Sequence, residues 1–201
     1  MRKTQKDDLH AFLRSRRSIR RFKPDPVSAP VLERILTTAT HAPSAHNTQP
    51  WRFALVPPAS AGRDRLALAL TAAMRRDMTA AGAPEAEIEA RVARSLRRIR
   101  EAPVLVLLCR DVTAVREDKR EDEIMAIQSV ANAAAYLLLA AHAEGLGGNW
   151  ICWPLYAQEE ARQALDLPAT WQPQAMLFLG YAGEEPAEKN LKPLEEITRR
   201  I

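Results

Sequence analysis

The sequence predicts a layered architecture in which α-helices and β-strands alternate around a shared core. Short apolar runs bounded by proline or charge indicate buried strands at 51–56, 103–109 and 174–181. The stretches between these runs place apolar residues at helical spacing. The chain has 201 residues, 47% of them hydrophobic, which is enough to bury a core, and we expect a single domain over 1–201.

The first part of the chain predicts two helices before the first strand. A short helix is expected over 7–14, and Pro24 and Pro26 then favour extended chain. Ser28 is the expected N-cap of an amphipathic helix over 29–41, with a proline in its first turn. The polar loop APSAHNTQPW leads from this helix into the first strand.

The stretch 61–101 is highly charged, rich in alanine and helical in pattern. Gly82-Ala83-Pro84 divides it into two helices, and the second begins with acids and ends among arginines, as the helix macrodipole favours. We expect this stretch to form a mobile or lid-like excursion on the core.

The longest helix is expected over 121–144, with Gly145 as its C-cap. It is apolar nearly all round, which predicts a central position or a subunit interface. Gln128 and Asn132 are among several polar residues that argue against a membrane span. The remaining expected elements are a short strand at the end of GGNWICW, a helix over 157–166, the strand at 174–181 and a polar tail over 182–201.

Charge and cysteine content narrow the function classes only in part. The formal net charge is +4, and acids are interleaved with the arginines, so charge alone permits nucleic-acid binding without requiring it. Cys109 and Cys152 are the only cysteines and lie in apolar surroundings, which favours reduced thiols in a cytoplasmic protein. No apolar run follows the N-terminal MRKTQKDD, so we expect no signal peptide.

The segment SRRSIRRF, residues 15–22, places four arginines in eight positions. In extended chain, Arg16, Ser18 and Arg20 share one face, and two guanidinium groups with a hydroxyl between them match a phosphate monoester. The opposite face, which includes Ile19, would be partly solvated. The alternatives are a solvated basic face paired with local acids, or a nucleic-acid-binding module that uses the arginine cluster.

Two further segments carry groups that suit a flat polar ligand. The loop APSAHNTQPW offers Ser44, Asn47 and Gln49, whose donors and acceptors can read a ring edge, although an ordinary polar turn has the same composition. The glycines of GLGGNWICW allow close approach of the backbone to a flat ligand. Trp150 and Trp153 beside them could wall a pocket or serve as core aromatics.

Several common fingerprints are absent from the sequence. Neither GxGxxG nor GxxxxGK[ST] occurs, and the four histidines show no metal-ligand spacing. No Ser-His-Asp arrangement can be singled out. We therefore expect no metal site and no catalytic side chain of these kinds.

Four motifs in sequence order resemble those of the nitroreductase family of FMN-dependent flavoenzymes. They are RRSIRRF, APSAHNTQPWRF, GLGGNWI after the long alanine-rich helix, and LGY followed by KPLEEI, and together they span about residues 12–197. The resemblance implies an α+β fold whose central sheet is mixed but mostly antiparallel and flanked by helices, with a helical excursion at about 61–101. It also implies a homodimer with two FMN sites at the subunit interface.

The resemblance assigns site residues by their position in these motifs. The first motif would hold the FMN phosphate and ribityl chain, and the second would reach the flavin from the opposite subunit. The third would meet the isoalloxazine ring through backbone N–H groups. The tail would add a basic group near the phosphate. The residues so assigned are Arg16, Arg17, Ser18 and Arg20; Pro43, Ser44, Ala45, Asn47 and Gln49; Ile151, Cys152 and Trp153; and Lys189 and Lys192. Cys152 and Trp153 are bulkier than is usual in the family and would narrow the pocket.

The implied activity is ping-pong hydride transfer from NADH or NADPH through FMN to a small conjugated acceptor, such as a nitroaromatic, a quinone or an enoyl compound. No catalytic side chain is then indispensable. The stretch APEAEIEARVARSLRRIREAP also resembles the nitroreductase-like domain of deazaflavin coenzyme maturation, which would make the acceptor a dehydro precursor of that coenzyme. Oxidative flavin breakdown and reductive dehalogenation are further chemistries known on this fold.

Overall fold

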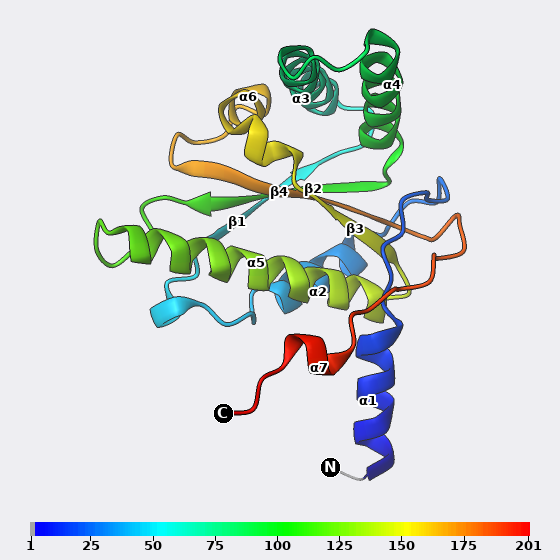
Figure 1. Ribbon diagram of the computed structural model, residues 1–201, viewed down its shortest axis with the longest axis vertical. Helices are drawn as coiled ribbons and strands as arrows, with labels where there is room; N and C mark the ends of the chain where they lie inside the picture. The colour runs from blue at the N-terminus through cyan, green and yellow to red at the C-terminus, as the bar shows by residue number, and fades with distance from the viewer. Residues whose placement is uncertain (1–2) are drawn as a thin grey trace.

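The computed structural model describes residues 3–201 and shows an α+β fold with helices on both faces of one sheet (Figure 1). Each pair of neighbouring strands is antiparallel, and the spatial order is β1-β2-β4-β3. A parallel bridge between Ser18 and Gly148 extends the β3 edge. The predicted fold class is therefore confirmed. The strands are β1 (Trp51–Val56), β2 (Val104–Asp111), β3 (Gly147–Ile151) and β4 (Trp171–Gly180).

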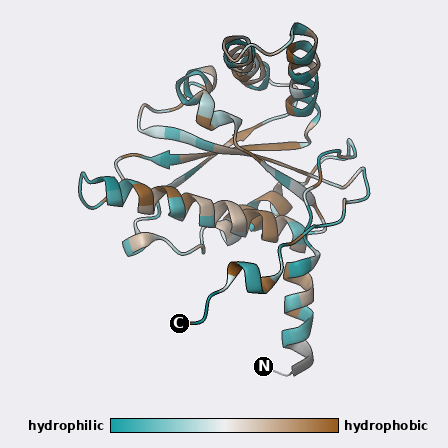
Figure 2. Cartoon of the chain, viewed as in Figure 1, coloured by the Kyte–Doolittle hydropathy of each residue, from teal (hydrophilic) through white to brown (hydrophobic). Residues whose placement is uncertain are grey.

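Helices α2 (Ala29–Ala39) and α5 (Arg120–Ala143) cover one face of the sheet (Figure 1). Alanines of α5 pack against alternate apolar side chains of β2 and β4, because small residues let a helix approach a sheet closely. The hydropathy colouring in Figure 2 shows these helices and the strands carrying much of the hydrophobic ribbon. By length and composition alone, α5 could cross a membrane, but the core helices of many proteins pass the same test. The buried side of α5 packs on the sheet.

Helices α3 (Ala61–Ala80), α4 (Glu85–Glu101) and α6 (Gln158–Ala164) cover the opposite face. Leu66 and Leu70 of α3 are fully buried against the sheet. The expected excursion over 61–101 is thus present as two helices, but its inner face is part of a second core, which contradicts a freely mobile lid. Buried Arg63 fixes it further by donating to the carbonyl oxygens of Val56 and Ala102.

The other elements are short or lie at the edges of the two layers. They are α1 (Lys3–Ser15), the 3₁₀ turns η1 (Ala45–Asn47) and η2 (Trp153–Tyr156), and α7 (Leu194–Ile197) in the tail. The helix expected over 29–41 ends at Ala39, and Gly145 has the positive φ of 76° expected of a C-cap. The short strand expected at the end of GGNWICW lies instead at its start, over β3, and the chain turns at Cys152.

Candidate functional site

The arginine segment, residues 16–22, runs in extended form beside the β3 edge of the sheet. The Ile19 N–H donates to the Gly148 carbonyl oxygen at 3.2 Å, and Phe22 forms a bridge with Ala182 just beyond β4. The Gly183 N–H closes this connection on the Arg21 carbonyl oxygen at 3.0 Å. Backbone pairing therefore fixes where the arginine side chains emerge.

Two glycines of GLGGNWICW lie close against other parts of the chain. A Cβ added to Gly147 would lie 2.5 Å from the Ile19 side chain, and one added to Gly148 would lie 2.8 Å from Leu179. These two glycines thus make room for close packing of the protein's own chain. The expectation that Ile19 would be partly solvated is wrong, because this contact leaves it only 5% exposed.

Side chains of the arginine segment and the tail line one cleft of about 200 Å³. Arg16, Arg17, Ser18 and Arg20 border it together with Lys189, so the structure brings these five predicted residues together. Lys192 does not line this cleft and lies exposed farther along the tail.

The cationic side chains of this cleft differ in the groups that they contact. Arg17 donates to the carbonyl oxygens of Arg14 and Arg16, at 2.5 and 3.0 Å, and so caps the end of α1. Within residues 3–201, Arg16, Arg20 and Lys189 form no ion pair. Three cations without ion-pair partners, beside a hydroxyl, form a donor set that fits a phosphate dianion.

The end of α1 is held close to this cleft by contacts with α5. Ser15 Oγ lies 2.8 Å from His142 Nε2, and the rings of Phe12 and His142 stack with centroids 5.0 Å apart. Burial and the nearby Arg16 charge lower the pKa of His142. This anchor holds Arg16 near the end of α5, and no sequence motif points to His142 as part of the site.

The predicted ring-contact residues lie where β3 gives way to η2. Ile151 pairs with Met176 in the sheet, Cys152 is exposed at the turn, and Trp153 packs partly against the second core. The adjoining Asn149 is 4% exposed, yet its Oδ1 has no hydrogen-bond partner within the described chain. A buried amide oxygen without a partner is costly, and it marks a position where a ligand donor would fit.

The loop 43–49 adopts a strained backbone. His46, Asn47 and Gln49 have φ values of 52°, 56° and 46°, which are uncommon for residues other than glycine. Such strain is characteristic of functional loops held by their surroundings. Within the loop, Ser44 Oγ accepts from the Gln49 N–H at 3.2 Å, and so the polar side chains partly stabilise the turn itself.

This loop is anchored to the first half of α5. Ser129 Oγ accepts from the Ala45 N–H, and Asn132 Nδ2 donates to the Pro43 carbonyl oxygen, both at 3.2 Å. Ser129 and His142 are thirteen positions apart on α5, which corresponds to about 20 Å. One chain therefore does not bring the loop and the arginine segment together, and Figure 1 shows η1 and α1 at opposite ends of α5.

Polar contacts at the nearby end of the sheet support the loop. Arg52 donates to the Gln49 carbonyl oxygen at 3.1 Å and to Asp111 Oδ2 at 2.7 Å. Burial raises the pKa of Asp111, but hydrogen bonds from Thr113 and the charge and hydrogen bond of Arg52 outweigh it, so the pKa lies below its ordinary 3.8. Asp111 is therefore ionised at neutral pH and holds Arg52 against the loop.

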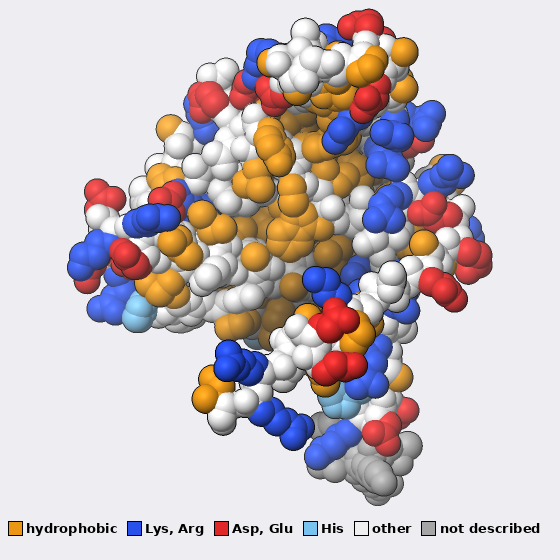
Figure 3. Space-filling view, in the orientation of Figure 1, with side chains coloured by type: hydrophobic (Ala, Val, Ile, Leu, Met, Phe, Trp, Pro, Cys, Tyr) orange, Lys and Arg blue, Asp and Glu red, His pale blue; other side chains and the backbone are white. Residues whose placement is uncertain are grey.

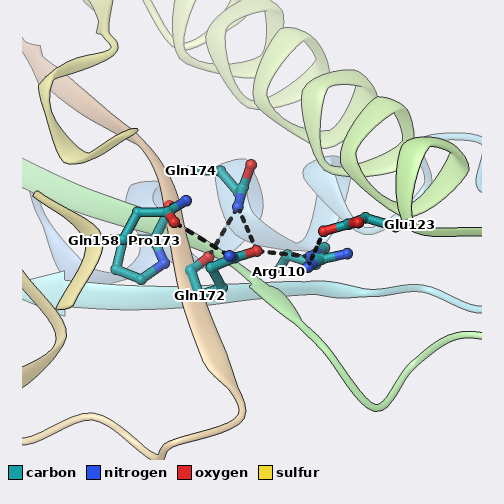
Figure 4. Close-up of polar contacts among 6 residues, drawn as sticks. All are labelled: Arg110, Glu123, Gln158, Gln172, Pro173 and Gln174. Carbon is teal, nitrogen blue, oxygen red and sulfur yellow. Dashed lines mark hydrogen bonds and ion pairs between the residues drawn. The ribbon is translucent and has the colours of Figure 1, made fainter. Parts of the chain in front are cut away.

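A partly buried polar network adjoins this ion pair (Figure 4). Arg110 of β2 donates to Gln172 Oε1 at 3.0 Å and to Glu123 Oε1 at 2.8 Å. Gln172 in turn donates to Gln158 Oε1 at 3.2 Å. The network ties the first turn of α5 and the start of α6 to the strands, and so stiffens the platform under the loop.

The two cysteines and the acids supply no second centre. Burial raises the pKa of Cys109 to about 12, so this thiol is inert, whereas Cys152 is exposed. No group of three or more His, Cys, Asp or Glu side chains placed to hold a metal occurs among residues 3–201.

Comparisons with known proteins agree with the sequence motifs. The model of the nitroreductase family matches residues 13–181. The chain is 32% identical to a 5,6-dimethylbenzimidazole synthase from Rhodospirillum rubrum, over 97% of this chain and 92% of that protein. It is 31% identical to an NADH dehydrogenase from Thermus thermophilus, over 90% of each.

Solved structures show the same fold. A nitroreductase-like protein from Desulfovibrio desulfuricans, in complex with FMN, superposes with a TM-score of 0.77 at 26% identity and 96% coverage of both chains. A BluB-like flavoprotein from Clostridium difficile gives a TM-score of 0.80 at 23% identity, covering 96% of this chain and 98% of that one.

Proposed function

The chain belongs to the nitroreductase family and is an FMN-dependent oxidoreductase, and from this premise we propose that it works as a homodimer that passes hydride from NADH or NADPH to a small conjugated acceptor. Nitroaromatic, quinone and enoyl compounds are the acceptor classes we propose, with ping-pong kinetics. The observation that carries the proposal is the cleft in which Arg16, Arg20 and Lys189 lie beside Ser18 and, within the described residues, form no ion pair, although Glu188 also lines the cleft.

The role of the protein is to bind and orient, since FMN when bound supplies the two-electron chemistry. Arg16, Ser18 and Arg20 would hold the phosphate, with Lys189 closing the cleft from the tail and Lys192 adding charge beyond it. Arg17 would contribute through its position at the end of α1. The unpartnered Asn149 Oδ1 would accept from a donor on the bound nucleotide.

The turn after β3 would lie along the flavin ring. Ile151 ends the strand, and Cys152 and Trp153 begin a tight turn whose backbone N–H groups we assign to the ring edge. We propose no catalytic side chain, because no carboxylate or histidine is among the residues assigned to this turn.

A second copy of the chain completes the site in this proposal. The loop residues Pro43, Ser44, Ala45, Asn47 and Gln49 lie about 20 Å along α5 from the arginine segment, so they would reach the flavin of the partner subunit. The outer side of α5 carries exposed Ile124, Ile127 and Tyr136, which suits burial against a second copy.

The visible absorption spectrum of the purified protein tests the cofactor directly. We expect a yellow protein that retains FMN through dialysis, and whose FMN is bleached by NADH or NADPH under nitrogen. A screen of nitroaromatics, quinones and deazaflavin precursors against the reduced enzyme would then identify the acceptor. A colourless protein that takes up no FMN would contradict the proposal, and salt-dependent retention on nucleic acid would favour the alternative reading of the arginines.

Flavin breakdown is a second candidate, favoured by the relative from Rhodospirillum rubrum named 5,6-dimethylbenzimidazole synthase. That product carries two nitrogens on a dimethylated benzene ring, and the isoalloxazine ring of FMN contains the same unit. FMN would therefore serve as the substrate. Reduced enzyme exposed to air would then lose its flavin and release the benzimidazole. A reductase would recover its yellow colour in air with the flavin intact.

A further inference from the structure

Helix α4 brings a second group of arginines to the site. A cleft of about 640 Å³ lies between α4 and the arginine segment. Figure 3 shows basic side chains gathered below α4, beside an apolar hollow in this face of the molecule. The arginines that line the cleft are Arg20, Arg21, Arg94, Arg97 and Arg98. Ser18 and Arg20 also border the smaller cleft assigned to the FMN phosphate, so the two clefts adjoin.

Three arginines of α4 line this cleft. Within residues 3–201, Arg94, Arg97 and Arg98 form no ion pair. They occur three and four positions apart, where like charges on a helix repel each other. Burial and the charges of Arg94 and Arg20 lower the pKa of Arg98, and the charge of Glu184 opposes this shift only in part. A bound anion would relieve the repulsion that remains.

The acids at the cleft do not neutralise these arginines. Of the three glutamates that line it, Glu184 accepts from the backbone N–H groups of Arg20 and Arg21, at 2.6 and 3.2 Å. Within the described residues its carboxylate forms one ion pair, a loose one at 3.9 Å from Arg21. Glu184 therefore fixes the arginine segment, and the other two glutamates, Glu101 of α4 and Glu185, form no ion pair in the described chain.

The same face of α4 leads toward the proposed ring site. Arg91, one turn before Arg94, lines another cleft together with Trp153 and Tyr156. Arg91 and Arg98 are seven positions apart, which is about 10 Å along the helix. A ligand with an aromatic ring at one end and phosphates at the other could therefore lie along α4, with its ring near Trp153.

We propose that Arg94, Arg97 and Arg98 bind the 2′-phosphate of NADPH, and that NADPH is the preferred electron donor. The inference rests on the proposed function, because it assigns the donor of the same site. NADH and NADPH differ only in this phosphate, a dianionic monoester that guanidinium groups bind in bidentate geometry. The FMN phosphate already has Arg16, Ser18 and Lys189 in the adjoining cleft, which leaves the α4 arginines for a second anion.

Calorimetric titration of the oxidised holoenzyme with NADP⁺ and NAD⁺ tests this assignment. In the variants Arg94→Ala and Arg98→Ala we expect the Kd for NADP⁺ to rise by roughly 10- to 100-fold each, the effect of losing one charge-assisted hydrogen bond. The Kd for NAD⁺ should change little. Arg98→Lys should recover only part of the loss, because an ammonium group lacks the fork geometry.

Arg100→Ala is the matched control on the same helix. Arg100 is exposed and pairs with Asp64 of α3 at 2.9 Å, so its loss removes the same charge without touching the cleft. An equal loss of NAD⁺ and NADP⁺ affinity in the α4 variants would overturn the inference, and so would unchanged NADP⁺ affinity. Loss of FMN from Arg94→Ala or Arg98→Ala would also overturn it, since the cleft would then belong to the flavin.

The wild-type holoenzyme provides a test that needs no variant. Adenosine 2′,5′-bisphosphate should bind more tightly than adenosine 5′-monophosphate and compete with NADPH, because only the former carries the 2′-phosphate. Equal affinity for the two probes would contradict the inference while leaving the FMN-dependent activity intact. A protein without FMN would instead count against the proposed function and not against this assignment alone.

Discussion

The Ile19 N–H donates to the Gly148 carbonyl oxygen at 3.2 Å, and the Ile19 side chain fills the space that a Cβ on Gly147 would need. This contact joins two motifs that are far apart in the sequence. It places the arginine segment alongside β3, so the groups assigned to the phosphate and those assigned to the ring share one rigid edge. The geometry of the site therefore depends on a glycine that need not touch any ligand.

Gly147→Ala is expected to displace the arginine segment. The new Cβ would lie 2.5 Å from Ile19, whose branched side chain is stiff, and overpacking of this kind costs about 1–3 kcal/mol. We expect a lower free energy of unfolding in urea and weaker FMN retention. Gly62→Ala is the control, because its Cβ would meet only an ordinary contact at 3.4 Å. Equal stability and flavin content in both variants would contradict this role of Gly147.

Replacing Arg16 and Arg20 together by alanine should weaken FMN binding by several kcal/mol. Each guanidinium would otherwise contribute roughly 1.5–3 kcal/mol through charge-assisted hydrogen bonds to the phosphate. FMN fluorescence during dialysis measures the change, and Arg21→Ala serves as the control because Arg21 is exposed and lies near Glu184. Full flavin occupancy in the double variant would show that the phosphate binds elsewhere.

The lowered pKa of Asp111 predicts that the folded protein loses stability in acid. Its pKa in the folded protein lies below 3.8, so its stabilising contribution is complete above that pH and is lost as pH falls through the folded value. We expect Asp111→Asn to be about 1–3 kcal/mol less stable than the parent at pH 7, with the two curves converging in strong acid. Urea unfolding across this range measures it, and a difference that stays constant with pH would exclude the carboxylate as its cause.

The lowered pKa of His142 predicts a second pH effect on stability, in weak acid. Burial and Arg16 lower its pKa in the folded state, so the unfolded chain binds a proton more readily. The stability of the FMN-free protein should therefore be complete above about pH 6.5 and fall as pH drops below it. His142→Asn should remove this dependence, whereas His41→Asn, at an exposed position, should keep it. An equal pH dependence of the unfolding free energy in the two variants would show that another group is responsible.

Periodicity and turn signals predicted most of the fold. The strand expected at 51–56 is β1 without change, and the break at Gly82-Ala83-Pro84 separates α3 from α4. The glycine run was the main error, because glycines are usually weak strand formers. Here the lack of side chains is what allows Ile19 to pack against β3, and such a long-range contact leaves no local signal in the sequence.

The site could be predicted only as separate pieces. The resemblance assigned the arginine segment and Lys189, and the structure brings these into one cleft. It did not assign Asn149, whose Oδ1 has no hydrogen-bond partner in the described chain, or the three arginines of α4 that form no ion pair there. Helical spacing of Arg94, Arg97 and Arg98 was visible in the sequence, but it could not reveal that they face Arg20 across a cleft.

The proposed contribution of two subunits to each site can be tested by subunit complementation. A variant with Arg16 and Arg20 replaced by alanine should lose activity, and so should one with Asn47 and Gln49 replaced by alanine. In a heterodimer of the two, one site carries all four changes and the other carries none, because each site takes its arginines from one chain and its loop from the partner. Co-expression with two different affinity tags, followed by tandem purification, should therefore restore about half of the wild-type activity and one FMN per dimer. If both groups instead served the same chain's site, every site in the heterodimer would be defective and the activity would stay as low as in the parental variants.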